Sequence, residues 1–213
     1  MKRMNYQSPI TNRPSSLTLA AIVLAAGMSR RMGQPKMLLP WSRTTVLGQV
    51  VATLSGGGVG EILVVTGGAR EAVEAEVARL AESLPVRAVF NAQYEAGEMM
   101  SSIRAGLAGL GPQVAATLVA LGDQPQLSLE SARRVVSAWE MSGSRLILPS
   151  FDRRRGHPWL VERGLWNELA AAKTARRFLN AHAGEILYVD CDETVLKDLD
   201  TPEEYARDLK NEG

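Results

Sequence analysis

The chain has 213 residues, of which 46% are hydrophobic and 22% are charged. This size and composition are typical of one well-packed globular domain and leave little room for a second. A formal net charge of +1 gives no electrostatic reason to expect nucleic acid or an anionic membrane as a partner. The single cysteine, Cys191, excludes an internal disulfide and a cysteine-based zinc site, and we expect it to be a structural strand residue.

The first segment, Met1–Ser16, is polar and shows no periodic hydrophobic pattern. We expect a flexible leader there, followed by a single domain over residues 17–213. The hydrophobic run Leu17–Ala26 follows basic residues and superficially resembles a signal peptide. Because the run is short, leads directly into a basic loop and would form a strand that the fold needs, we expect it to be retained and the protein to be cytoplasmic. No stretch reaches the ~18 apolar residues that a membrane span requires.

The chain then alternates short apolar runs with segments of helical spacing. Strands are predicted at Leu19–Ala26, Glu61–Thr66, Val86–Phe90, Ala115–Leu121 and Arg145–Leu148. Helices are predicted at Val46–Leu54, Arg70–Glu82, Ser101–Leu110 and from Ser128 to about Met141. This alternation predicts a mainly parallel sheet covered by helices on both faces, which is a three-layer α/β fold.

The pattern is less regular after Pro149. We expect a loop or hairpin over Phe151–Val161 and short helices over Glu162–Ala171 and Thr174–Ala183. Two more strands are predicted at Glu185–Val189 and Val195–Leu199, and a closing helix, Glu203–Lys210, has Pro202 in its first turn.

The loop between Gly27 and Lys36 contains small and basic residues directly after the first strand. Glycine lets backbone N–H groups approach an anion, and Arg31 and Lys36 supply positive charge, so the loop is suited to a phosphate. The alternative is an ordinary strand-to-helix turn with solvated basic residues. Neither standard nucleotide-loop motif, GxxxxGK[ST] or GxGxxG, is present.

Four loops share the same expected position in the sheet. Ligands of open α/β sheets bind at the carboxyl ends of the strands. The loops predicted there are Gly27–Lys36, Gly67-Gly68, Asn91–Met100 and Gly122–Pro125. Their convergence is stronger support for a site than any one of them.

Asp123 directly follows the most apolar strand of the chain. A carboxylate there is costly unless it is paired, and Mg²⁺ is a suitable partner, although a turn-capping role is the alternative. Asp198 and Asp200 alternate along the predicted last strand and would face the same side. We favour Asp198 as a second metal ligand and Asp200 as a helix cap.

His157 lies between Gly156 and Pro158. A histidine in such a loop suggests a ligand or substrate contact, with a surface turn as the alternative. The adjacent arginines, Arg153–Arg155, are either solvated or receive an anionic second substrate. His182, in a polar helix end, is expected to be exposed to solvent.

Taken together, these segments resemble the MobA-like nucleotidyltransferases, and within them the molybdenum cofactor cytidylyltransferase branch. The resemblance extends from about Thr18 to the end of the chain. It is carried by Leu24-Ala-Ala-Gly-x-Ser-x-Arg-Met-Gly-x-x-Lys36, Val64-Val-Thr-Gly67, Asn91-x-x-Tyr-x-x-Gly97, Gly122-Asp-Gln-Pro125, Arg155-Gly-His-Pro158 and Asp198-x-Asp-Thr-Pro-Glu-Glu-Tyr205.

This resemblance implies a three-layer α/β/α Rossmann-like nucleotidyltransferase fold and transfer of CMP from CTP to the phosphate of molybdopterin, with release of pyrophosphate. It implies catalytic roles for Arg31, Lys36 and Asp123, and Mg²⁺ held by Asp123 with Asp198. Nucleotide-binding residues would be Leu24, Ala25, Ala26, Gly27, Thr66, Gly67, Asn91, Ser102 and Gly122. The second substrate would meet Gln124, Arg155 and His157.

Other functions remain open at this point. The same chemistry could use another base or acceptor, such as guanylyl transfer to the same cofactor or transfer to a sugar phosphate or phospholactate. A non-catalytic carrier that delivers the cofactor to a molybdenum hydroxylase belongs to a different class. Retention of Arg31, Lys36 and Asp123 argues against the carrier.

Overall fold

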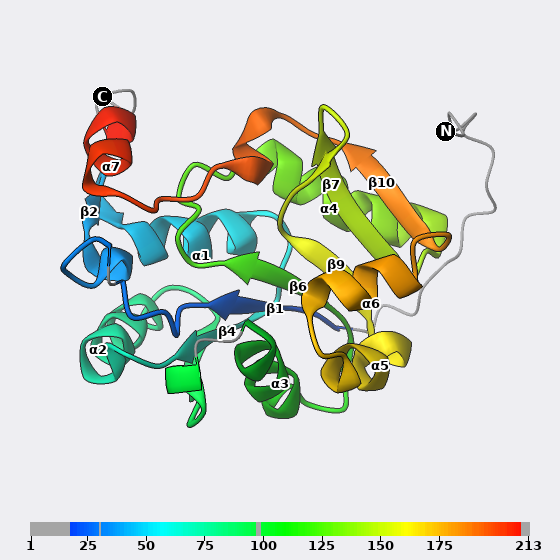
Figure 1. The fold of residues 1–213 in the computed structure, drawn as a ribbon, viewed down its shortest axis with the longest axis horizontal. Coiled ribbons are helices and arrows are strands. Elements are labelled where there is room, and N and C mark those ends of the chain that lie inside the picture. Colours follow the sequence, from blue (N-terminus) through cyan, green and yellow to red (C-terminus); the bar gives the residue numbers. More distant parts are fainter. Residues whose placement is uncertain (1–17, 30, 97–98, 210–213) are drawn as a thin grey trace.

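The computed structural model describes residues 18–29, 31–96 and 99–209. The predicted leader, residues 1–16, lies outside the described residues. The chain forms an eight-stranded sheet of order β10-β7-β9-β6-β1-β4-β5, with β8 paired to β7 (Figure 1). The strands are β1 (Thr18–Leu24), β4 (Glu61–Thr66), β5 (Val86–Phe90), β6 (Val114–Leu121), β7 (Leu146–Phe151), β8 (Arg154–Arg155), β9 (Trp159–Glu162) and β10 (Ile186–Asp190).

Most neighbouring strands run parallel, as predicted. The exception within the main order is β9, which lies antiparallel between β6 and β7. The loop or hairpin expected over Phe151–Val161 is therefore a hairpin, whose second part enters the sheet. A separate two-stranded sheet, β2 (Pro40–Trp41) with β3 (Thr44–Thr45), follows the basic loop.

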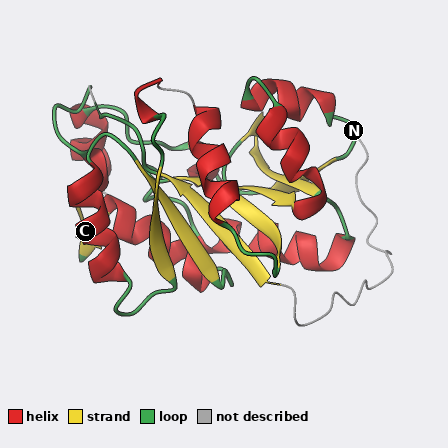
Figure 2. Cartoon of the chain, turned by 90° about the horizontal axis from the view of Figure 1, so that it is seen from below, coloured by secondary structure: helices red, strands yellow, loops and turns green. Residues whose placement is uncertain are grey.

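Helices cover both faces of the sheet (Figure 2). Leu19, Ala21 and Val23 of β1 point to one hydrophobic core, and Ala20 and Ile22 point to the other, because successive side chains of a strand alternate. The first core contains apolar residues of α1 (Val46–Gly56), α2 (Arg70–Leu80) and α4 (Leu129–Ser142); the second contains those of α3 (Met99–Gly109), α5 (Trp166–Ala171) and α6 (Ala175–Ala181). The predicted three-layer fold is confirmed.

The predicted strand at Val195–Leu199 is wrong. Glu193–Leu196 forms a 3-10 helix, because the Asp192 side chain accepts a hydrogen bond from the Thr194 N–H at 2.9 Å and starts a turn. Leu199 then donates its N–H to the Asp123 carbonyl at 2.9 Å. Asp198 and Asp200 therefore do not alternate along a strand. The closing helix begins at Pro202, as α7 (Pro202–Leu209).

The expectation of an exposed His182 is also wrong. Its ring is buried against Phe178, with ring centroids 4.7 Å apart. Nε2 lies 3.2 Å from Glu168 and Nδ1 lies 3.1 Å from Glu185. Phe178, one turn earlier in α6, belongs to the core, so the same helix face carries His182 inward.

A third, smaller cluster joins the basic loop to the end of the chain. Met32, Leu39, Trp41 and Val46 pack with the fully buried Leu199. The Tyr205 hydroxyl of α7 donates to the Pro40 carbonyl at 2.6 Å. This cluster holds the segment 199–205 against the loop that follows β1.

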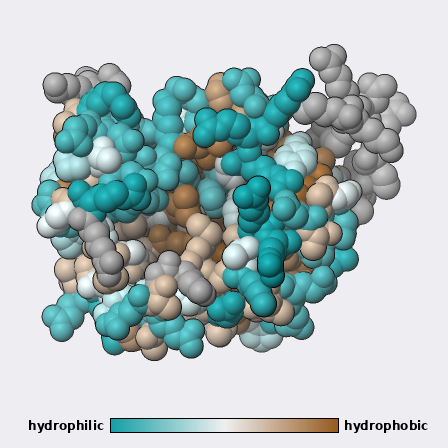
Figure 3. All heavy atoms as spheres, in the orientation of Figure 1, coloured by the Kyte–Doolittle hydropathy of each residue, from teal (hydrophilic) through white to brown (hydrophobic). Residues whose placement is uncertain are grey.

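Hydrophobic residues reach the surface in the middle of the face shown in Figure 3, with hydrophilic side chains on either side. None of the helices in the described part of the chain has the length and apolarity needed to cross a membrane.

We expect Leu199→Ala to lower the free energy of unfolding by about 2–4 kcal/mol, because it leaves a cavity in the small cluster. Urea denaturation measures this difference. Leu129→Ala serves as the control, since Leu129 is 39% exposed and its truncation should have a much smaller effect. Equal losses in the two variants would show that the small cluster contributes little.

Candidate active site

The carboxyl ends of the parallel strands meet at one edge of the sheet. Leu24, the last residue of β1, pairs with Val65 of β4 and with Leu121 of β6. Trp159, at the start of the antiparallel β9, pairs with Val119, so the segment before it reaches the same edge. The loops predicted to converge are therefore neighbours, and the segment containing His157 joins them.

A pocket of about 470 Å³ lies beside the basic loop. Its charged lining comes from Arg31 and Lys36 on one hand and from Glu95 and Asp200 on the other. The remaining lining residues are Gly27, Met28, Ser29, Met32 and Ala96. The pocket thus combines two cations with two carboxylates, whereas the sequence predicted a mainly cationic loop.

A second pocket of about 200 Å³ is lined by Gly27 as well, and is mostly apolar. Four residues predicted to bind the nucleotide line it: Leu24, Ala26, Gly27 and Ser102. Tyr94, Met99 and Leu121 complete the lining. The Ser102 hydroxyl also accepts a hydrogen bond from the Asn91 side chain at 3.1 Å.

The other predicted nucleotide-binding residues support these walls from behind. Thr66 is fully buried and donates its hydroxyl hydrogen to Glu74 at 3.1 Å. Asn91 is buried and donates to Ser101 at 2.9 Å in addition to Ser102. Ala25 is buried and donates its N–H to the Val65 carbonyl at 3.0 Å.

Two glycines permit the close approach of the loops. A Cβ at Gly67 would lie 2.5 Å from the Ala26 carbonyl oxygen, and one at Gly122 would lie 3.0 Å from the Leu24 carbonyl oxygen. The Gly122 N–H donates to that same Leu24 carbonyl at 3.0 Å. Any side chain at Gly67 would push apart the loops after β1 and β4.

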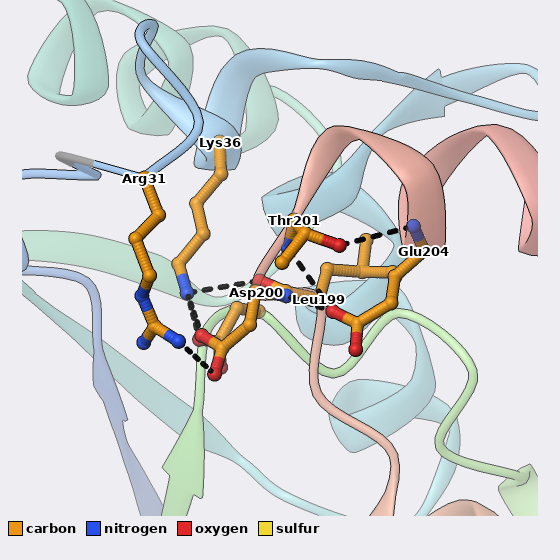
Figure 4. A network of polar contacts seen from close by, with 7 residues as sticks. Arg31, Lys36, Leu199, Asp200, Thr201 and Glu204 are labelled. Carbon is orange, nitrogen blue, oxygen red and sulfur yellow. Dashed lines mark hydrogen bonds and ion pairs between the residues drawn. The ribbon is translucent and has the colours of Figure 1, made fainter.

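Lys36 lies at the centre of a charged cluster (Figure 4). Its ammonium contacts the carboxylate of Asp123, donates to the Leu199 carbonyl at 3.0 Å and lies 3.4 Å from Asp200. Arg31 pairs with the other oxygen of Asp200 at 3.0 Å. The structure therefore brings the three predicted catalytic residues together, and adds Asp200 between the two cations.

Asp200 was expected to cap the last helix, but that cap is formed by its neighbours. The Thr201 hydroxyl accepts from the Glu204 N–H at 3.2 Å, and the Glu204 carboxylate accepts from the Thr201 N–H at 3.0 Å. This reciprocal arrangement is a capping box, and the sequence Thr201-Pro-Glu-Glu204 carries its signature. This signature predicts that Thr201 and Glu204 cap the helix, so the Asp200 side chain is not needed for capping.

The carboxylates at this edge fit a hard divalent cation. The pKa of Asp198 is raised, because desolvation disfavours its charged form and the nearby Asp123 carboxylate repels it. Within the described ranges, no three histidine, cysteine, aspartate or glutamate side chains surround a common point. Asp123 and Asp198 are enough for Mg²⁺, which takes one or two protein carboxylates and otherwise keeps water or phosphate oxygens.

The three residues predicted to contact a second substrate differ in their exposure and in their neighbours. Arg155 is exposed and turns toward β10 and α6, where Nε donates to the Tyr188 hydroxyl at 2.9 Å and Nη1 donates to Asn180 at 3.3 Å. His157 stacks on Trp159, with ring centroids 4.5 Å apart. Gln124 is buried next to Asp123.

His157 is held in its neutral form. Its Nε2 is buried and finds no hydrogen-bond partner among the described residues. Desolvation lowers the pKa of His157 to about 4, so the imidazole carries no charge near neutral pH. A neutral imidazole can donate or accept a hydrogen bond, but it carries no charge that would attract an anion.

The mainly parallel sheet is shared with a solved nucleotidyl transferase from Methanothermobacter, which has a TM-score of 0.77 at 25% identity, with coverages of 92% of this chain and 97% of the neighbour. The fold is therefore that of the nucleotidyltransferase class of α/β proteins. The profile of the MobA-like NTP transferase domain matches residues 21–186. The chain belongs to the MobA-like NTP transferase family.

Its similarity to individual proteins spans nearly the whole chain. It is 34% identical to nicotine blue oxidoreductase from Paenarthrobacter nicotinovorans over 200 residues, covering 89% of this chain and 95% of the relative. It is 26% identical to the molybdenum cofactor cytidylyltransferase of Escherichia coli over 186 residues, with coverages of 86% and 92%. The crystal structure of Rv0371c from Mycobacterium tuberculosis, a complex with manganese, has a TM-score of 0.70 at 29% identity, with coverages of 91% and 98%.

His157, whose Nε2 is buried and which is neutral in the folded chain, predicts a loss of stability at acid pH. Its pKa is about 4 in the folded chain and near 6.5 when unfolded, so the unfolded state binds the proton first as the pH falls. We expect protonation of His157 in the unfolded chain to lower the free energy of unfolding by about 2 kcal/mol between pH 7 and pH 5. Chemical denaturation at both pH values, compared between wild type and His157→Gln, measures this. The variant should lose less stability on acidification, and equal losses would contradict a neutral imidazole in the folded chain.

Proposed function

We propose that the protein transfers CMP from CTP to the terminal phosphate of a molybdopterin-type cofactor and releases pyrophosphate. One observation carries the proposal: Arg31, Lys36 and Asp123 meet beside a pocket that shares Gly27 with a smaller, apolar pocket. The motifs shared with the cytidylyltransferase branch and the 26% identity to the Escherichia coli enzyme support the choice of substrates.

The larger pocket would hold the triphosphate. The acceptor phosphate attacks the α-phosphorus in line with the departing pyrophosphate, so the protein contributes mainly by positioning groups and neutralising charge. Arg31 and Lys36 would stabilise the negative charge that develops on the pyrophosphate. Both side chains line this pocket.

The smaller pocket would hold the nucleoside. Leu24, Ala26 and Gly27 offer an apolar wall, and Ser102 offers a hydroxyl group. Ala25, Thr66, Gly67, Asn91 and Gly122 would set the shape of that wall, because they tie together the loops behind it.

Asp123 with Asp198 would hold Mg²⁺. Bound there, the ion would neutralise triphosphate charge and orient the reacting phosphate. The manganese complex of Rv0371c supports a divalent ion in a protein of similar fold. Lys36 also donates to the Leu199 carbonyl. This hydrogen bond would keep the ammonium at the pocket when the Asp123 carboxylate binds the ion.

The acceptor would lie toward Gln124, His157 and Arg155. His157 would provide one neutral hydrogen-bonding group, since its pKa is depressed. Arg155 would meet the anionic part of the acceptor after leaving Tyr188 and Asn180. A cytoplasmic molybdenum hydroxylase that receives the product is the client we propose.

A second candidate is oxidation–reduction of an organic molecule. It is favoured by the 34% identity to nicotine blue oxidoreductase across most of both chains. Consumption of a reduced nicotinamide cofactor in the presence of nicotine blue, with no pyrophosphate release from any nucleoside triphosphate, would establish this candidate instead.

The decisive assay for the transferase follows pyrophosphate release from each nucleoside triphosphate with Mg²⁺ and molybdenum cofactor. We expect release with CTP, and a loss of at least about 100-fold in kcat for Asp123→Asn, because the carboxylate charge beside the reacting phosphates is gone. Release with GTP alone would move the protein to guanylyl transfer.

Glu203→Gln is the control for this assay, because it removes one carboxylate charge from an exposed position of α7. It should leave kcat unchanged. Binding of CTP and cofactor without any turnover would favour the carrier, and full activity of Asp123→Asn would contradict the proposed metal site.

A further inference from the structure

The carboxylate of Asp192 collects hydrogen bonds from two segments that are far apart in the chain. Oδ2 accepts from the hydroxyls of Ser128, at 2.6 Å, and Ser131, at 3.0 Å, both at the start of α4. Oδ1 accepts from the Thr194 N–H, at 2.9 Å, and from the Thr194 hydroxyl. Although desolvation opposes ionisation, these hydrogen bonds lower the pKa of Asp192 to about 2.

Thr194 makes the same connection in the opposite direction. Its hydroxyl oxygen accepts the N–H of Ser128 at 3.1 Å while its hydrogen is donated to Asp192. Ser128 in turn caps α4 by accepting the Ser131 N–H at 3.1 Å. The segment between β10 and α7 is therefore fastened to the start of α4, beside which it passes (Figure 1).

The 3-10 helix that contains Thr194 supports the segment that carries His157. Val195 directly follows Thr194 and is fully buried, and its carbonyl accepts the His157 N–H at 2.9 Å. Gly156 lies against the same carbonyl, so that a Cβ there would be 2.4 Å from the oxygen. His157 therefore takes its position from this 3-10 helix.

The start of α4 holds the other residue that faces the proposed acceptor. Gln124 is buried, its carbonyl accepts the Leu127 N–H at 3.2 Å, and Ser128 is the next residue along the chain. Asp192 and Thr194 thus tie the loop of Gln124 to the loop of His157. Neither of them lines the larger or the smaller pocket, so both would act on a ligand only through these loops.

We propose that Asp192 and Thr194 are positioning residues that set the distance between Gln124 and His157, and through it the affinity for the acceptor. The assignment of these loops to the acceptor rests on the proposed function, whereas the support of His157 by the 3-10 helix is independent of it. Loss of the Thr194 hydroxyl leaves the Ser128 N–H and an oxygen of Asp192 each short of a partner. The 3-10 helix is then released from α4 and holds His157 less firmly.

The first test follows the ring protons of the two histidines by NMR on the full chain as the pH is lowered, with His157→Gln to assign the signals. In wild type, His157 should titrate with a pKa of about 4. Thr194→Val keeps the shape of the side chain and removes the hydroxyl, so water should reach the imidazole. We then expect His157 to titrate at least about one pH unit higher, because its desolvation is relieved. Thr194→Ser restores the hydroxyl and should restore the wild-type titration.

The second test is the pyrophosphate assay with the concentration of molybdenum cofactor varied. Asp192→Asn and Thr194→Val should raise the KM for the cofactor about fivefold or more, because the loops that contact it are no longer held together. The KM for CTP should stay within about twofold of the wild-type value, since the pockets proposed for the nucleotide are not lined by either residue.

Asp190→Asn is the matched control, because it makes the same change two positions away, at an exposed site. Both its histidine titration and its two KM values should equal those of wild type. Thermal melting shows whether each variant is folded, and Asp192→Asn, which leaves the Thr194 hydroxyl in place, is the milder of the two changes.

Two results would overturn the inference. One is a wild-type titration of His157 in folded Asp192→Asn and Thr194→Val; the other is an equal rise of both KM values, which would show a general loss of structure. If wild type releases no pyrophosphate from any nucleoside triphosphate, the proposed function fails by itself. The NMR titration then still decides whether Asp192 and Thr194 position His157.

Discussion

The contacts of Lys36 join three segments that are far apart in the chain. Its ammonium meets Asp123 after β6, the Leu199 carbonyl and Asp200 before α7. The side chain is only 12% exposed, so its charge must be satisfied by these groups. An ammonium has three donors, and three partners surround it. The larger pocket has its present charge and shape because this lysine holds the basic loop, the end of β6 and the C-terminal segment in one place.

The close packing of backbone at the sheet edge provides the second constraint. Gly67 leaves no room for a Cβ beside the Ala26 carbonyl, and Gly122 lies against the Leu24 carbonyl. One part of the smaller pocket's wall is therefore backbone and the small residues Ala26 and Gly27, while Leu24, Tyr94, Met99 and Leu121 provide larger side chains. The buried Asn91 and Thr66 support the loops behind it.

Local patterns predicted most of the fold. The alternating apolar runs located the parallel strands, and the hydrophobic faces of α1 to α4 located the helices that cover them, because each buried element requires its own periodic pattern. Two predictions failed because of contacts that hydrophobic periodicity does not include. Asp192 turned the predicted strand at Val195–Leu199 into a 3-10 helix, and the core position of Phe178 carried His182 into a buried site between two glutamates.

The sequence by itself determined the class of fold, and it predicted that Arg31, Lys36 and Asp123 lie at the same edge of the sheet, because these follow from strand periodicity and from the loops that come after strands. Only the tertiary structure decided that Asp200 faces the cations while Thr201 and Glu204 cap α7. The position of a carboxylate relative to residues more than 150 positions away depends on how Leu199 and Tyr205 pack against the loop after β1. That packing is a long-range property, and no local pattern contains it.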